Sequence, residues 1–185
     1  MRIYEGSPRQ DWEEVLRAIG AFADREKLKE LLLLELEEGF LLQGLAIGAG
    51  GADSDTFGVL AKRTYELLDE QVAQLMDEAA AARTANADAV PHAEVRNYFE
   101  QALRVIGAWI DQEKARDVFF FEQDGSFVLR LLHASAGGAV GHRLAEFTKD
   151  EIVAMIEAAP QQRAAAAAAS AATPAAEAPP GEASQ

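Results

Sequence analysis

The sequence predicts an α+β fold, a tandem duplication of one helix–β-hairpin–strand–helix unit whose two copies are related by a pseudo-twofold axis. Three observations predict this fold: an internal repeat, apolar residues at helical spacing where each copy begins, and two apolar runs joined by a turn that follow in each copy. Each copy is expected to form a small antiparallel sheet with packed helices, and to bury its apolar stripe against the other copy.

The internal repeat is a match without gaps between residues 12–45 and residues 99–132, at an offset of 87. Thirteen of the 34 aligned pairs are identical, whereas average composition would give roughly two or three. A weaker match continues at an offset of 80, between residues 60–79 and residues 140–159. We interpret the repeat as a duplication.

The repeat also sets the expected domain boundaries. Residues 1–82 form the first α+β unit, residues 83–91 a short connector, and residues 92–159 the second unit. The tail, residues 160–185, is rich in alanine and proline and lacks the large apolar side chains that offset ordering entropy. We therefore expect the tail to be disordered.

The first element of each unit is predicted to be an amphipathic helix. Apolar side chains recur at helical spacing between residues 12 and 22, and again between residues 99 and 109. Gly20 and its counterpart Gly107 stand inside these helices, where glycine costs about 0.5–1 kcal/mol relative to alanine. We interpret both glycines as places where another helix or the sheet approaches closely.

A β-hairpin is predicted next in each copy. In the first copy two apolar runs flank a turn ending in Gly39, and in the second copy they flank Asp124 and Gly125, a strong hairpin signal. Because residues 31–34 and 118–121 are continuously apolar, these strands are expected to be covered on both faces.

A third strand and a closing helix complete each unit. The third strands are predicted at residues 61–67 and 141–147. Thr148 and Glu151 are spaced as a capping box for the closing helix of the second unit.

Charge and cysteine content restrict the expected partners. The 185 residues include 31 acidic and 17 basic side chains, a formal charge of −14, and no cysteine. This charge repels phosphate backbones and anionic lipid surfaces, so we expect neither nucleic acid nor membrane as a partner. It fits either simple solubility, the interpretation that we favour, or a basic protein as the partner. Disulfides and thiol chemistry are excluded, and the lack of an apolar signal core predicts a cytoplasmic location.

The glycine-rich loop at residues 48–58 is the first candidate site. Asp53 and Asp55, two positions apart among glycine amides, are the candidate ligands for a hard cation. The lysine followed by serine or threonine that a phosphate loop needs is missing. We favour a connector between strands, and keep as the alternative function a small-ligand or metal-binding regulatory protein that uses this loop.

A carboxylate on the first strand and an arginine on the third recur in both copies, as Glu35 with Arg63 and Glu122 with Arg143. We predict structural ion pairs across the sheet, one in each unit, because a bidentate pair would fix strand register. The functional alternative for these glutamates is an acid with a raised pKa at the floor of a groove.

The order of the predicted elements over residues 8–160 is similar to that of the secretion-chaperone and YbjN-like α+β folds. This resemblance of topology implies a protein that binds segments of other proteins. Together with the duplication, the acidic charge and the lack of a catalytic or cofactor motif, it favours a non-enzymatic protein-interaction module, an adaptor or chaperone-like protein without a cofactor. An enzyme with an unrecognised pair of acids stays open as a third hypothesis.

Overall fold

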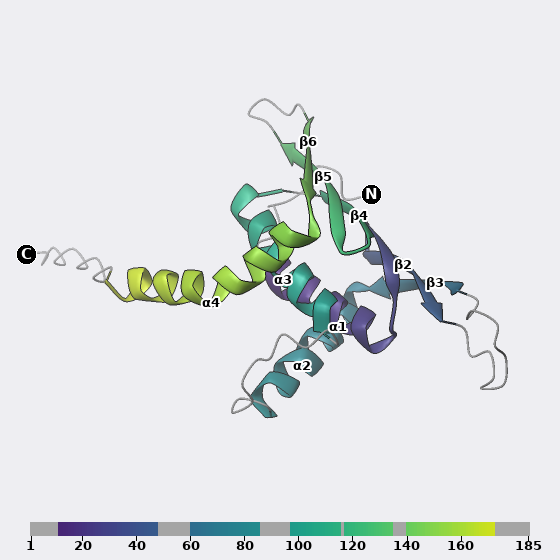
Figure 1. The fold of residues 1–185 in the computed structure, drawn as a ribbon, viewed down its shortest axis with the longest axis horizontal. Coiled ribbons are helices and arrows are strands. Elements are labelled where there is room, and N and C mark those ends of the chain that lie inside the picture. The colour runs from purple at the N-terminus through teal and green to yellow at the C-terminus, as the bar shows by residue number, and fades with distance from the viewer. Residues whose placement is uncertain (1–10, 48–59, 86–96, 116, 135–139, 173–185) are drawn as a thin grey trace, which may run out of the picture.

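The computed structural model describes residues 11–47, 60–85, 97–115, 117–134 and 140–172. Within them the fold is α+β, with four helices and a six-stranded antiparallel sheet (Figure 1). A helix, three strands and a helix follow one another, and the same order then recurs. The elements are α1 (Trp12–Arg25), β1 (Lys29–Leu36), β2 (Gly39–Ile47), β3 (Leu60–Leu68), α2 (Asp69–Ala85), α3 (Tyr98–Glu113), β4 (Asp117–Gln123), β5 (Ser126–Ala134), β6 (Val140–Phe147) and α4 (Lys149–Ala172).

One sheet contains all six strands, in the order β3-β2-β1-β4-β5-β6. The two predicted hairpins are β1–β2 and β4–β5, and the third strands β3 and β6 form the two edges. The hairpins join at the centre because β1 pairs with β4, where Leu33 lies opposite Phe120. The expectation of a separate small sheet in each unit is therefore corrected, since β1 and β4 satisfy each other's backbone groups in one continuous sheet.

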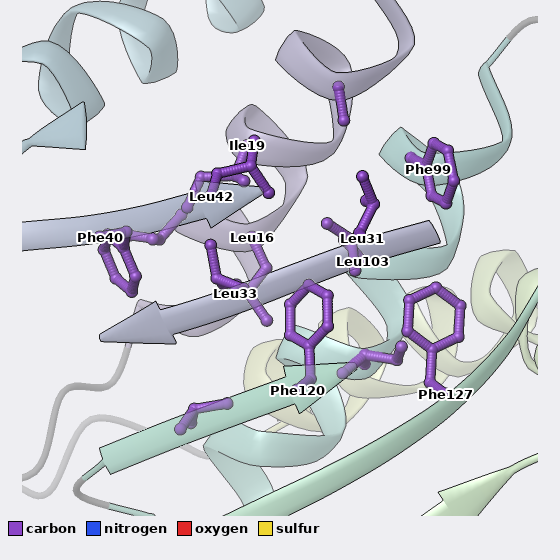
Figure 2. Packing of buried hydrophobic residues seen from close by; sticks show 14 of the residues in the cluster. Leu16, Ile19, Leu31, Leu33, Phe40, Leu42, Phe99, Leu103, Phe120 and Phe127 are labelled. Carbon is purple, nitrogen blue, oxygen red and sulfur yellow. The ribbon is translucent and has the colours of Figure 1, made fainter. Parts of the chain in front are cut away.

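Helices α1 and α3 lie side by side and cover one face of this sheet (Figure 1). They run antiparallel, because the end of α1 is hydrogen-bonded to the start of α3 and the end of α3 to the start of α1. Leu16 and Leu103 of the helices gather with Leu33, Phe120 and Phe127 of the strands (Figure 2). All five side chains are completely buried, so the core lies between the helix pair and the sheet.

Glycine at the helix crossing brings the two backbones into contact. A Cβ atom added to Gly20 would lie 2.6 Å from the carbonyl carbon of Phe99, and one added to Gly107 would lie 2.6 Å from that of Trp12. These distances are shorter than any ordinary contact of a Cβ atom. The interpretation of the two glycines as places of close helix approach is confirmed.

Helix α4 begins with the predicted capping box. The backbone N–H of Glu151 donates to Oγ1 of Thr148, and the N–H of Thr148 donates to the carboxylate of Glu151. The helix then continues through Pro160 to Ala172, so the first part of the tail that was expected to be disordered is helical. Alanine, the strongest helix former, fills most of that part. Residues 173–185 lie outside the described residues.

Candidate interaction surface

The sheet face that points away from α1 and α3 carries partly exposed apolar side chains. Successive residues of a strand point to opposite faces. Leu33 and Phe120 are completely buried under the helices, whereas their neighbours Leu34, Phe119 and Phe121 are 39%, 37% and 40% exposed. The expectation that these strands are covered on both faces is therefore wrong: the continuous apolar runs supply a core on one face and an open apolar surface on the other.

Six side chains of this open face form one contiguous patch, called here the apolar block. At its centre, where the hairpins meet, Leu34 lies opposite Phe119 and Leu32 opposite Phe121. The neighbouring strands β2 and β5 each add one residue, placed opposite a central one. Side chains directly opposite each other on antiparallel strands are close enough to touch. The apolar block consists of Leu32, Leu34, Leu41, Phe119, Phe121 and Val128.

Charged side chains on the outer strands border the apolar block. Glu66 of β3 lies opposite Leu41, and Glu146 of β6 lies opposite Val128. Both glutamates are exposed. Because the two edge strands are five strand spacings apart in the sheet order, these carboxylates are separated by about 24 Å. Arg130 of β5 and Lys62 of β3 are exposed basic residues of the same face, and the exposed Leu68 and Leu144 extend its apolar surface to the two edge strands.

Two aspartates at the helix pair hold the starts of the helices. The carboxylate of Asp24, in the last turn of α1, accepts hydrogen bonds from the backbone N–H groups of Phe99 and Glu100 at 3.1 and 2.8 Å. Asp111, in α3, accepts the corresponding bonds from the first two residues of α1 at 3.1 and 3.0 Å. A helix start offers unpaired donors and a positive dipole end, so both carboxylates act as caps supplied by the opposite helix.

The capping site of Asp24 predicts an unusual dependence of stability on pH. Burial in the fold raises the pKa of Asp24 from its ordinary value of 3.8 to about 6. When the pH falls from 7.5 to 5, Asp24 takes up a proton in the folded chain but stays largely ionised in the unfolded chain. The free energy of unfolding should therefore rise between pH 7.5 and pH 5. Burial also raises the pKa of Asp111, which adds in the same direction.

Urea unfolding at the two pH values measures this effect. The Asp24→Asn variant, which cannot titrate at this position, should lose part of the gain, whereas the exposed Asp77→Asn control should keep it. An unfolding free energy of Asp24→Asn that changes with pH as much as that of the wild type would contradict the assignment.

Glu122 and Glu35 hold backbone amides where the two hairpins meet. Glu122 is 3% exposed, and its carboxylate accepts hydrogen bonds from the N–H groups of Leu31 at 3.0 Å and Gly125 at 2.6 Å. Glu35 accepts one from the N–H of Val118 at 3.3 Å. Burial raises the pKa of Glu122. Its two amide bonds give this acid a structural role across the β1–β4 junction.

The predicted ion pairs Glu35–Arg63 and Glu122–Arg143 are separated by the strand register. The glutamate lies on the first strand of its unit and the arginine on the third, two strand spacings away. The arginine also stands four residues, about 13 Å, along its strand from the residue that is level with the glutamate. Arg143 instead pairs with Glu113 at the end of α3. The structure thus brings together neither predicted pair.

The remaining candidates are the glycine-rich loop and, among the described residues, two hollows, one of which, of about 260 Å³, has Glu37, Glu38 and Glu66 among its lining residues. The loop with Asp53 and Asp55 lies outside the described residues. No group of three or more His, Asp or Glu side chains in the described ranges is placed to hold a metal ion. A groove of about 440 Å³ between α3, β6 and α4 has mostly apolar walls, with Glu13 and Arg163 as its charged lining residues. One acid and one base do not form the pair of acids that general acid–base catalysis by carboxyl groups would use.

In the part of the chain that the structure describes, no helix combines the length and the apolar character needed to cross a membrane. Among the described residues, the apolar block is a contiguous, partly exposed apolar surface with Glu66 and Glu146 at its border. The chain matches no protein-family model, no curated protein and no solved structure.

Proposed function

We propose that the chain is a non-enzymatic protein-interaction module, an adaptor or chaperone-like protein of the cytoplasm, which binds a partner protein through the apolar block. The observation that carries this proposal is the set of six neighbouring apolar side chains that stay partly exposed on one sheet face. Contiguous exposed apolar surface of this kind marks interaction sites on soluble proteins. Phe119 and Phe121 at its centre are of the residue type that dominates binding energy at interfaces.

We infer in addition that the fold is a tandem duplication, which would explain how the apolar block arose. Each block residue in β1 or β2 has its repeat counterpart in β4 or β5, so Leu32 matches Phe119, Leu34 matches Phe121 and Leu41 matches Val128. The reciprocal caps and the reciprocal glycine contacts of α1 and α3 support the same relation. A fused pair of like units would thus build one continuous binding face from two half-faces.

Replacement of the central phenylalanines should remove binding without unfolding the chain. In Phe119→Thr/Phe121→Thr the outward apolar area is lost, while threonine keeps the preference for a strand. Each phenylalanine exposes enough surface to contribute about 1 kcal/mol on burial, so recovery of bound partner should fall about tenfold or more. Quantitative affinity capture from the native lysate, with wild type and variant at equal concentration, measures this loss.

The matched control is Val153→Thr, which removes an exposed apolar side chain from α4, outside the apolar block. Circular dichroism shows whether both variants keep the fold of the wild type. Retention of the same partners by the folded double variant would contradict the proposed function, and so would an equal loss in Val153→Thr.

A further inference from the structure

We propose that the segment bound by the apolar block is an amphipathic α-helix whose apolar stripe is bordered by lysine or arginine. This inference rests on the proposed function and adds to it the secondary structure and the charge of the partner. Three features of the open face support this inference: the apolar block at its centre, the position of this block on the inner strands of the sheet, and the glutamates at its border.

The position of the apolar block favours a helix over an extended strand. The block lies on the four inner strands, β2, β1, β4 and β5, away from the two sheet edges where an added strand would find backbone partners. An extended segment laid on this face would present only every second side chain to it, and its N–H and C=O groups, which point sideways, would find no partner on this face. A helix satisfies these groups internally and presents only side chains. The opposite face of the same sheet is already packed against two helices.

The acidic border favours basic residues beside the apolar stripe of the partner. Glu66 and Glu146 stand at opposite ends of the face, next to Leu41 and Val128 respectively. The whole chain carries a formal charge of −14, which adds a long-range attraction for a basic segment. A helix that reaches both glutamates spans about 24 Å across the strands, which corresponds to about 16 residues.

The same charge disfavours a second copy of this chain as the occupant. Two copies stacked through their open faces would bring two charges of −14 together, and this repulsion opposes close association. The two border glutamates of each copy would lie at the rim of such an interface. A basic helix is instead attracted by the net charge of the chain and by Glu66 and Glu146 at the two ends of the face, although Arg130 lies between them.

Synthetic peptides test the proposal directly. Three fluorescent 16-residue peptides share one composition of leucine and alanine: the first carries leucines at helical spacing with lysine borders, the second has glutamate borders, and the third is the lysine peptide with its order scrambled. Fluorescence anisotropy with the full chain should show the lysine peptide binding about tenfold or more tightly than the other two. Higher salt should weaken this binding.

Variants of the chain assign the binding to the open face. Phe119→Thr/Phe121→Thr should weaken the lysine peptide about tenfold. Glu66→Lys/Glu146→Lys should weaken it about fivefold and improve the glutamate peptide. The matched control Glu70→Lys/Glu157→Lys makes the same change of charge at exposed acids of α2 and α4, and should leave the preference between peptides intact.

Three outcomes would overturn the inference. Equal affinity for lysine-bordered and glutamate-bordered peptides rejects the basic border, and equal affinity for the scrambled peptide rejects the helix. Concentration-dependent dimers that disappear in Phe119→Thr/Phe121→Thr identify a second copy as the occupant. If that variant loses its cellular partners while the peptides show no preference, the proposed function stands and this inference alone fails.

Discussion

Gly20→Ala and Gly107→Ala should each lower the free energy of unfolding by about 2–3 kcal/mol, although alanine is the better helix former. The added methyl group would meet the backbone of the opposite helix, at the carbonyl group of Phe99 or of Trp12. Backbone cannot rotate away as a side chain can, so the helices must separate or shift along each other. Because the same seam carries the caps made by Asp24 and Asp111, a shift also weakens those hydrogen bonds.

Thermal unfolding followed by circular dichroism measures this effect as a decrease in melting temperature of roughly 5–10 °C for each variant. Gly141→Ala is the matched control, since a Cβ atom on Gly141 has no neighbour within 4 Å. That control should melt within about 2 °C of the wild type. Wild-type melting temperatures for both helix variants would show that the two backbones are not in contact at Gly20 and Gly107.

The sequence predicted the elements well because their signals are local and appear twice. The hairpin turns at Gly39 and Gly125, both with positive φ, and the capping box at Thr148 are settled within a few residues of chain. The apolar stripe of the first helix and the two apolar strand runs recur in both copies, so each of these elements could be checked against its counterpart. The close approach at Gly20 was also predictable, because glycine inside an amphipathic helix requires a packing reason.

The joining of the two hairpins into one sheet could not be predicted from local signals. Pairing of β1 with β4 brings together segments almost ninety positions apart in the sequence, and the apolar pattern of each strand is equally compatible with two separate sheets. The continuous apolar runs in these strands predict two covered faces. Their alternating exposure shows that an apolar run can also serve an open surface, which a single sequence does not distinguish from a buried one.

The roles of the repeated acids could be predicted only in part. Repetition of Glu35 and Glu122 indicates a structural carboxylate, but the strand register places the predicted arginine partners four residues away from the positions level with them. Asp24 and Asp111 were visible as identities within the repeat, yet their targets lie on the opposite helix. Every residue except proline has a backbone N–H group, so a sequence does not show which of these groups a distant side chain caps. Such contacts are found only in the three-dimensional structure.

Glu122→Ala should lower the free energy of unfolding by about 3 kcal/mol, since it leaves two backbone donors without their acceptor. The N–H groups of Leu31 and Gly125 point at this carboxylate from the central strand β1 and from the turn after β4. Both bonds lie in buried surroundings, where water replaces a lost acceptor poorly. Urea unfolding at neutral pH measures the loss, and Gln123→Ala, an exposed position on the same strand, is the control that should change little.

Glu122→Gln separates the loss of hydrogen bonds from the loss of volume. Glutamine fills the same space but offers one acceptor oxygen and one NH₂ group, so one of the two amides then faces a donor. The free energy of unfolding of Glu122→Gln should lie between that of Glu122→Ala and that of the wild type. A glutamine variant as stable as the wild type would mean that one hydrogen bond is enough to hold the junction. Suppose that Glu122→Ala lowers the free energy of unfolding no more than Gln123→Ala does. The carboxylate of Glu122 would then not be what holds β1 and the hairpin turn, and a functional role for this acid would again be open.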